Sequence, residues 1–459
     1  MLVAVSAAAC HHERGLKSPA TGEPLVVAEP TLQGPKPGTR AVFGDIEIVG
    51  NTTLADQFIR RQLLYRPGDL FSRKDILDSQ RRLASMPLLD SVKIEIIDDP
   101  RRADVRTRVT VVEGDPRRVS FAFGFGTEEK LAIEATLEHV NFLGGARTLG
   151  IDGKWSWLDR GVEGRFLQPY FFRRDLSLTL QGRTWHVDER GFRALSQGGR
   201  ATVTHTPAPA LSTSVSFVHE FDTSRITDES LRDLSLRNEL TGIGLDSTTG
   251  TQKGVLSAVA IQVRHSTVTD SVDPHDGHVL LVQAERAGGP LPGTFDYLNV
   301  LGEGRHYTTS RGLTLAQRIR YGSIRATEGP SAIPYFKRYF LGGSNSLRGW
   351  GRYEVSPLSG SGLPIGGASL FEAGTEVRFP VASALSGAVF VDTGAVWRDA
   401  GTFRVADLLY DAGTGLRYLT PIGPVRVDVA YQLTALQGLR IEGRQQRRWR
   451  IHFSIGQAF

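Results

Sequence analysis

Apolar and polar residues alternate with a period of two through most of the chain after residue 116. Residues 119–125 place one valine and three phenylalanines on one face and small residues on the other. Residues 425–431 place valines and a tyrosine on one face, with Arg426 and Asp428 on the other. Side chains alternate in this way along β-strands. We therefore expect about 16 strands, near 117–126, 131–139, 148–157, 161–169, 175–187, 197–206, 211–221, 255–265, 278–287, 294–306, 311–321, 368–378, 386–397, 410–419, 423–432 and 447–458.

The lengths of the connections between these strands indicate where the apolar face points. A water-soluble barrel packs its apolar face inside, whereas a membrane barrel turns it toward lipid and encloses a wet lumen. The two longest connections, 222–254 and 322–367, fall at the same end of the barrel, while the turns at the other end are short. This asymmetry is typical of outer-membrane barrels. We expect an all-β transmembrane barrel over residues 116–459, with 322–367 as a long inserted loop and an extra hairpin near 238–246.

A different pattern occupies residues 41–115, where strand signals alternate with helical spacing. In order, we expect a strand at Val42–Val49, helices at 53–64 and 72–85, and strands at Leu89–Ile97 and 105–113. Thr52 or Thr53 would cap the first helix and Ser72 the second. The order β-α-α-β-β predicts a small α/β domain with two helices on a three-stranded sheet.

The first 40 residues lack a folded pattern. Residues 1–10 form a short apolar run of small residues that ends in Cys10, the one cysteine of the chain. This run resembles the end of a bacterial lipoprotein signal, in which Cys10 would be lipidated, and an ordinary export signal is the alternative. Residues 11–40 carry Pro and Gly at short intervals, which predicts a flexible linker.

Composition excludes several other classes of protein. No apolar run approaches the roughly 20 residues that a membrane helix needs. The net charge of +5 is spread over 54 basic and 49 acidic residues, which does not favour nucleic acid as a partner. A single cysteine excludes an intrachain disulfide framework and a cysteine-based metal site.

Residues 340–353 (FLGGSNSLRGWGRY) bring a glycine-rich stretch of the long loop. The phase of the next two strands turns Glu376 and Asp392 toward the lumen on neighbouring strands. Two adjacent carboxylates repel each other unless a cation joins them, and an arginine can bond carboxylates with two N–H groups at once. From the residues alone, Arg378, Arg417 or lumen water are alternative partners for the carboxylates.

Several motifs resemble known families. Residues 41–115 resemble a POTRA domain through the stretches 46–51 (IEIVGN) and 67–76 (PGDLFSRKDI) and the apolar residues Leu83, Leu89, Val92 and Ile94. Residues 345–350 (NSLRGW), 374–380 (GTEVRFP) and 390–394 (FVDTG) resemble the signature of the BamA/TamA-type outer-membrane assembly and translocation barrels. That resemblance assigns Arg348 to the contact with Glu376 and Asp392, as a lock on the inserted loop. The alternating last strand, with Phe453 and the terminal Phe459, resembles the terminal signal of such barrels.

The resemblance implies a bacterial outer-membrane protein, with its POTRA domain in the periplasm, that inserts or exports client proteins without ATP. Client strands would pair at a seam between the first and last strands, which Gly124, Gly126 and Gly456 would soften. The implied partners are unfolded outer-membrane or secreted clients, outer-membrane lipid, and a periplasmic or inner-membrane accessory protein that adds a strand to the POTRA sheet. The alternatives are a two-partner secretion transporter of the same superfamily and a passive porin-like channel.

No enzymatic site, metal or other cofactor is expected. The chain has no nucleophile elbow, HExxH motif or P-loop. His265, His275 and His278 are close in sequence, but they lie in and beside a short turn, where solvated histidines are commoner than metal ligands.

Overall fold

The computed structural model describes most of residues 41–459. The residues outside the description are 1–40, 87, 98–103, 190, 228–238, 240, 328, 330–331, 421–422, 442–443, 446–447, 456 and 459. The predictions for residues 1–10 and 11–40, including lipidation of Cys10, and those for Gly456 and Phe459 therefore lie outside the described residues.

The N-terminal module has the predicted order of elements. They are β1 (Val42–Val49), α1 (Asp56–Gln62), α2 (Arg73–Ala84), β2 (Leu89–Ile97) and β3 (Asp104–Glu113). The sheet order is β1-β3-β2, with β1 parallel and β2 antiparallel to the central β3. Both helices pack on this sheet, because Ile59, Ile76 and Leu83 are fully buried against Ile94 and Val109. Ser72 caps α2 as predicted, since its side chain accepts a hydrogen bond from Asp75 N.

The first helix is shorter than predicted, and neither threonine caps it. α1 begins after Ala55, which has no side-chain cap. The Glu113 carboxylate, at the end of β3, instead binds the segment before the helix. It accepts the backbone N–H groups of Thr52 (2.7 Å), Thr53 (3.0 Å) and Leu54 (2.8 Å), and also both threonine hydroxyls. Burial opposes ionisation of Glu113, but these hydrogen bonds outweigh it and lower its pKa to about 2.

This shift predicts that acid loosens the segment around α1. A carboxylate whose folded-state pKa is depressed stabilises the fold above its ordinary value near 4.5, and that stabilisation is lost as the pH falls toward 2. Glu113→Gln should remove it at neutral pH. We expect hydrogen exchange of residues 50–62, measured by mass spectrometry on the whole chain, to rise about tenfold in this variant.

Glu47→Gln is the matched control for this prediction. Glu47 forms a surface ion pair with Arg108 (3.0 Å), with both side chains more than two-fifths exposed. Such pairs contribute little to stability. Equal exchange in the two variants, at every pH tested, would contradict a special role for Glu113.

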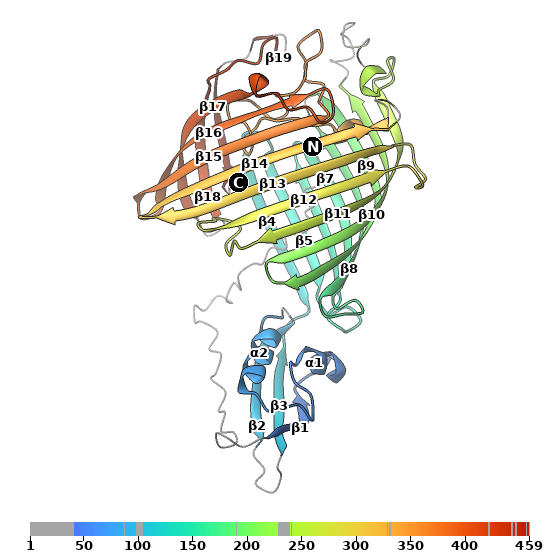
Figure 1. The fold of residues 1–459 in the computed structure, drawn as a ribbon, viewed down its shortest axis with the longest axis vertical. Coiled ribbons are helices and arrows are strands. Elements are labelled where there is room, and N and C mark those ends of the chain that lie inside the picture. Colours follow the sequence, from blue (N-terminus) through green and yellow to red (C-terminus); the bar gives the residue numbers. More distant parts are fainter. Residues whose placement is uncertain are drawn as a thin grey trace.

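Sixteen antiparallel strands form one curved sheet, which confirms the predicted fold class (Figure 1). Their bounds are β4 (Arg117–Gly126), β5 (Lys130–His139), β6 (Thr148–Ser156), β7 (Asp159–Gln168), β8 (Leu176–Asp188), β9 (Phe192–Ala208), β10 (Leu211–Ile226), β11 (Thr251–Ser266), β12 (Gly277–Ala287), β13 (Tyr297–Ser310), β14 (Leu313–Ala326), β15 (Ser369–Ala382), β16 (Leu385–Trp397), β17 (Leu409–Thr420), β18 (Gly423–Gln432) and β21 (Trp449–Ile455). Short elements in the loops are η1 (Thr241–Ile243), η3 (Tyr335–Lys337), η4 (Val405–Asp407), β19 (Arg440–Ile441) and β20 (Arg444–Gln445). No helix among the described residues is long and apolar enough to cross a membrane.

The barrel wall turns its apolar side chains outward and its charged side chains inward. Val389 and Val391 of β16 are about half exposed (47% and 49%), whereas Asp392 between inward-facing neighbours is only 2% exposed. Trp397 has the outward phase predicted for it but is 4% exposed. The loop after β16 covers it, with the Phe403 ring centroid 5.9 Å away.

The strands are longer than the apolar alternation indicated, and the loops are correspondingly shorter. β10 continues to residue 226 and β14 to residue 326, so the inserted loop spans residues 327–368 rather than 322–367. The hairpin predicted near residues 238–246 is wrong for the described part, which contains the 3-10 turn η1. The physical reason is burial, since Ile243 and Leu245 pack into the apolar cluster of the lumen.

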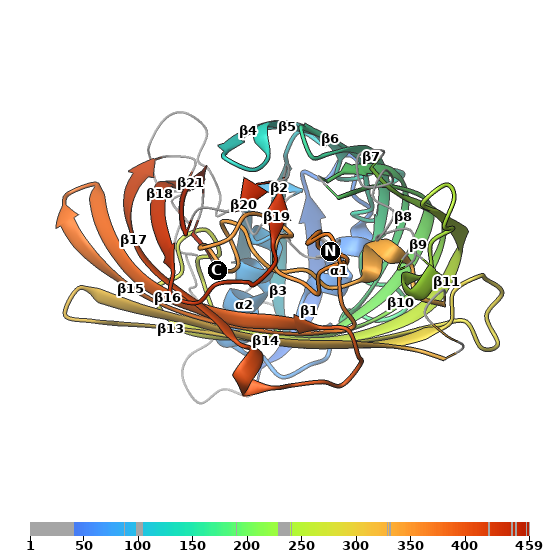
Figure 2. The same ribbon diagram turned by 90° about the horizontal axis from the view of Figure 1, so that it is seen from above.

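β4 and β21 lie at the two ends of the sheet order and approach each other (Figure 2). Thr127 N donates a hydrogen bond to Phe453 O (3.1 Å), and the rings of Phe125 and Phe453 are 5.7 Å apart. No strand ladder joins β4 to β21 among the described residues. We call this junction the seam.

The N-terminal module packs against the near end of the barrel, which holds the short turns (Figure 1). Val140, in the turn between β5 and β6, belongs to the buried core of the module. Asn141 Nδ2 donates to Thr53 Oγ1 (3.0 Å), and the ring of Tyr170 lies 5.7 Å from that of Phe58. The long loops gather at the opposite, far end.

Candidate functional site: the inserted loop and the seam

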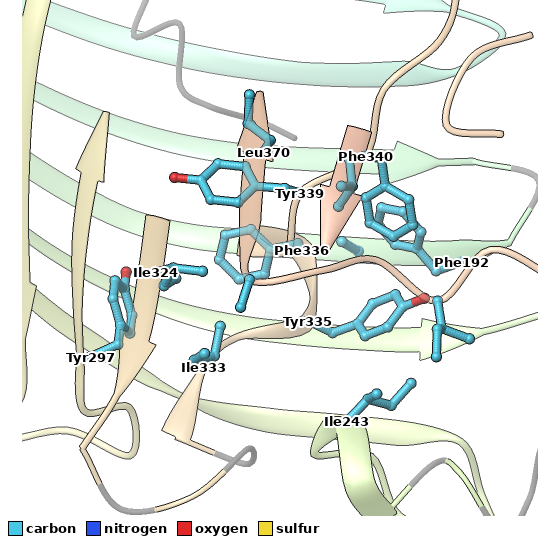
Figure 3. Packing of buried hydrophobic residues seen from close by; sticks show 14 of the residues in the cluster. Phe192, Ile243, Tyr297, Ile324, Ile333, Tyr335, Phe336, Tyr339, Phe340 and Leu370 are labelled. Atoms are coloured by element: carbon cyan, nitrogen blue, oxygen red, sulfur yellow. The ribbon is translucent and has the colours of Figure 1, made fainter. Parts of the chain in front are cut away.

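The loop between β14 and β15 folds back into the barrel and fills part of its lumen (Figure 2). Its aromatic side chains Tyr335, Phe336, Tyr339 and Phe340 pack together with Phe192 of β9 (Figure 3). All five are less than 5% exposed. Burial of these rings provides the main hydrophobic driving force for seating the loop.

Arg348 lies at the inner wall, fully buried, on the side of the loop that faces β15 and β16. Its Nε donates to Asp392 Oδ2 (2.7 Å) and its Nη2 to Asp392 Oδ1 (3.0 Å). Its Nη1 donates to Glu376 Oε2 (2.6 Å). The guanidinium also stacks on the ring of Phe390, 3.3 Å from the centroid. The structure therefore brings together the three charged residues that the sequence analysis singled out.

The carboxylates have further partners, so the alternatives raised by the sequence coexist. Glu376 also accepts hydrogen bonds from Arg378 Nε (2.9 Å) and from Arg417 Nη2 (3.1 Å). Arg417 in turn pairs with Asp428 of β18. In β-sheet register Asp392 lies opposite Gly374, so the two carboxylates are diagonal neighbours rather than at equal height. Arg348 thus enters a network of buried charges that spans β15 to β18.

Gly349 is required by space. A Cβ at this position would lie 2.7 Å from Asp411 Cβ and 3.1 Å from Gln432 Cγ. Its carbonyl oxygen accepts a hydrogen bond from Gln432 Nε2 (2.8 Å). The loop backbone therefore passes directly over β17 and β18, as the glycine-rich sequence predicted.

Three contacts of the loop escaped the sequence analysis. His452 Nε2 lies 2.8 Å from Arg348 O, and Arg450 Nη2 donates to Glu354 (2.7 Å). Both residues come from β21, where strand phase alone would have turned them inward. Glu128, in the turn after β4, accepts Ser344 N (3.0 Å). Nothing in the sequence marks Glu128, because its partner is more than 200 residues away.

These contacts place the loop on both sides of the seam. Glu128 follows β4, whereas His452 belongs to β21, and their side chains approach to 3.6 Å. Each is also bonded to the loop, at Ser344 and Arg348 respectively. Movement of the loop out of the lumen would therefore break contacts with both edges of the seam.

The structure distinguishes among the predicted seam residues. A Cβ at Gly126 would lie 3.1 Å from Phe453 O, so this glycine permits close approach of the two edges. A Cβ at Gly124 would make only an ordinary contact, 3.6 Å from Ala132. Phe453 packs on Phe125 at the outer face of the seam. Within the described part of the chain, no group of three or more His, Cys, Asp or Glu residues could hold a metal ion.

Comparisons with known proteins match this architecture. Residues 141–459 match the Omp85 superfamily domain, and residues 41–114 match the POTRA family, described as a surface antigen variable number repeat. The chain is 23% identical over 421 residues to the outer membrane protein assembly factor BamA of Nitratidesulfovibrio vulgaris, covering 90% of this chain and 50% of that protein. It is 21% identical over 473 residues to BamA of Neisseria meningitidis serogroup B, covering 92% and 57%. The chain thus spans about half the length of the curated relatives it matches.

Two solved structures share the fold. BamA from Haemophilus ducreyi lacking POTRA domains 1–3 superposes with a TM-score of 0.76 at 18% identity, covering 91% of this chain and 85% of that one. CdiB from Acinetobacter baumannii superposes with a TM-score of 0.57 at 14% identity, covering 91% and 74%. At these identities the likeness establishes the fold alone.

Proposed function

Because the chain belongs to the Omp85 superfamily, we propose that it inserts client proteins into the outer membrane, or exports them across it, by strand pairing at the seam. The resemblance to BamA/TamA-type barrels is confirmed at the level of the superfamily. The barrel lies in the outer membrane, with its POTRA domain and near end in the periplasm. The inserting or exporting activity acts without ATP and without an enzymatic step in this proposal.

The seam is the observation that carries the proposal. Backbone N–H and C=O groups that face lipid unpaired are costly, so an incompletely paired junction is a place where a client strand gains hydrogen bonds. β4 and β21 supply two such edges, and Gly126 lets them approach or separate without a side chain between them. A client strand would pair with one edge and then be followed by the next strand of the client.

The buried charge network supports a gated barrel rather than a passive porin-like channel. Trp350 and Arg348 are both fully buried inside the lumen. The inserted loop therefore occupies space that a passive channel leaves to water. We propose that the Arg348 network locks the loop in this position while the seam is closed.

The POTRA sheet offers one free edge for a client or accessory strand. The outer edge of β1 is covered, because Phe43 N donates to Asp69 O (2.8 Å) and Gly68 N donates to Phe43 O (2.7 Å). β2 lies at the other edge of the sheet. Strand addition would therefore take place at β2.

The test is insertion of a client by the purified chain. Proteoliposomes containing the chain should accelerate folding of a small outer-membrane barrel, followed by its shift on a gel without heating, and should do so with no nucleotide present. Client found inside the vesicles, without insertion, would indicate the two-partner secretion alternative. Leakage of small solutes with no effect on any client would indicate a porin-like channel and contradict the proposal.

A further inference from the structure

Three arginines gather where the POTRA domain meets the periplasmic turn between β7 and β8. Arg174 comes from this turn, Arg82 from α2, and Arg66 from the segment between the two helices. Arg174 Nη2 donates to Leu63 O (3.5 Å), at the end of α1. Burial and the positive charges of Arg82 and Arg66 lower the pKa of the Arg174 guanidinium, which is the signature of an uncompensated cluster.

The cluster lacks an internal counter-ion. Neighbouring Arg173 pairs with Asp175 (3.1 Å). In the part of the chain that the structure describes, neither Arg66, Arg82 nor Arg174 has a carboxylate within ion-pair distance. Three guanidinium groups that present only N–H donors are suited to a phosphate group.

The aromatic residue Tyr170 completes the polar side of the site. Burial raises the pKa of its hydroxyl, and the charge of Arg82 opposes this rise, so the guanidinium lies near the phenol. The ring is held in place against Phe58 of α1. Because one wall of the site is the POTRA domain and the other is the barrel, a ligand here would join the two.

Exposed apolar side chains adjoin this cluster. Phe172, at the tip of the same turn, is 89% exposed, and Leu143, in the turn between β5 and β6, is 78% exposed. On the strands above them, Leu137, Leu149 and Leu180 of the outer wall face lipid and are 38% to 52% exposed. Phe172 and Leu143 therefore extend the lipid-facing band past the strand ends, into the headgroup layer.

We propose that Arg66, Arg82 and Arg174 bind the phosphate headgroup of an anionic phospholipid of the periplasmic leaflet, with Phe172 anchored in the interfacial layer beside it. The charges select the headgroup and the phenylalanine selects its membrane-bound form over a free anion. Binding holds the POTRA domain against the periplasmic rim of the barrel. This site lies apart from the seam and does not depend on the proposed function.

Lipid retention by the whole chain tests the site. The chain is placed in nanodiscs of phosphatidylethanolamine with a fraction of phosphatidylglycerol, and native mass spectrometry counts the phosphatidylglycerol molecules that remain bound after release. Arg82→Gln/Arg174→Gln should weaken retention about 30-fold, because each basic residue near an anionic surface contributes about a five-fold factor in affinity. Arg81→Gln is the matched control, since Arg81 is the neighbour of Arg82 on α2 but pairs with Asp78 (3.3 Å).

Two further arms separate the possible sources of the phosphate group. Inorganic phosphate added to nanodiscs of phosphatidylethanolamine alone should not bind measurably, and binding equal to that of the lipid would overturn the proposal. The Phe172→Trp variant, compared with the unmodified chain, should show added fluorescence that brominated phosphatidylglycerol quenches. Unquenched fluorescence, or equal lipid retention in the double variant and the control, would also overturn it.

Discussion

Arg348→Ala is expected to release the inserted loop and to lower the heat resistance of the folded barrel. The substitution leaves Asp392 without the two N–H donors at 2.7 and 3.0 Å and removes one of the three arginines that bind Glu376. Removing one partner of a buried ion pair costs about 3–5 kcal/mol, because the remaining charge is buried without compensation. The temperature at which the barrel loses its fast migration on a gel should fall, and protease should cut within residues 340–353.

A second substitution separates charge from geometry. Arg348→Ala/Asp392→Asn also removes the uncompensated carboxylate, so heat resistance should partly return while the loop stays unlocked. Arg348→Lys keeps the charge but loses the forked geometry, and it should lie between the two. Arg352→Ala is the matched control in the same loop, since Arg352 pairs with Glu189 at a position that is 30% exposed. Normal heat resistance, loop protection and client insertion in Arg348→Ala would exclude the lock.

Covalent closure of the seam should abolish client insertion. Phe125→Cys/Phe453→Cys places two thiols where two rings now lie 5.7 Å apart on the outer face of β4 and β21. Oxidation, or a short crosslinker, would prevent the edges from separating, so the rate of client insertion should fall about tenfold or more, since unpaired backbone cannot be offered to the client. Reduction of the disulfide should restore the rate. The variants carry Cys10→Ser, because Cys10 is the one native cysteine.

A crosslink between strands that are permanently paired provides the control. Phe123→Cys/Ile133→Cys joins β4 to β5 at directly opposed positions, also on the outer face. That crosslink leaves the seam free and should not change the rate. Full insertion activity in the oxidised seam variant, with the crosslink verified by mass spectrometry, would rule out opening of the seam between β4 and β21.

The inward positions of Glu376 and Asp392 followed from strand phase alone. Successive side chains of a strand point to opposite faces, so the outward phase of Val389 and Val391 determines that Asp392 points inward. The same reasoning, applied to the last strand, would have placed His452 beside the loop. Strand number was also predictable, because each strand carries its own alternation between turn signals.

Strand ends and loop contents were predicted less well. β10 and β14 extend beyond their apolar alternation, because hydrogen bonds to neighbouring strands continue where side chains no longer alternate by polarity. Thr52 and Thr53 were expected to cap a helix, but Glu113 binds both from a strand about 60 residues later. Such a partner leaves no mark in the local sequence.

The sequence by itself determined the barrel, the POTRA domain and the inward-facing carboxylates, since these depend on periodicity within single strands and helices. Only the tertiary structure decided that Arg348, Arg378 and Arg417 share Glu376, and that Glu128 and His452 connect the loop to both edges of the seam. It alone also brought Arg66, Arg82 and Arg174 together at the periplasmic rim. The physical reason is that these contacts join residues far apart in the chain, so they depend on the path of the loop and on how the POTRA domain packs against the barrel.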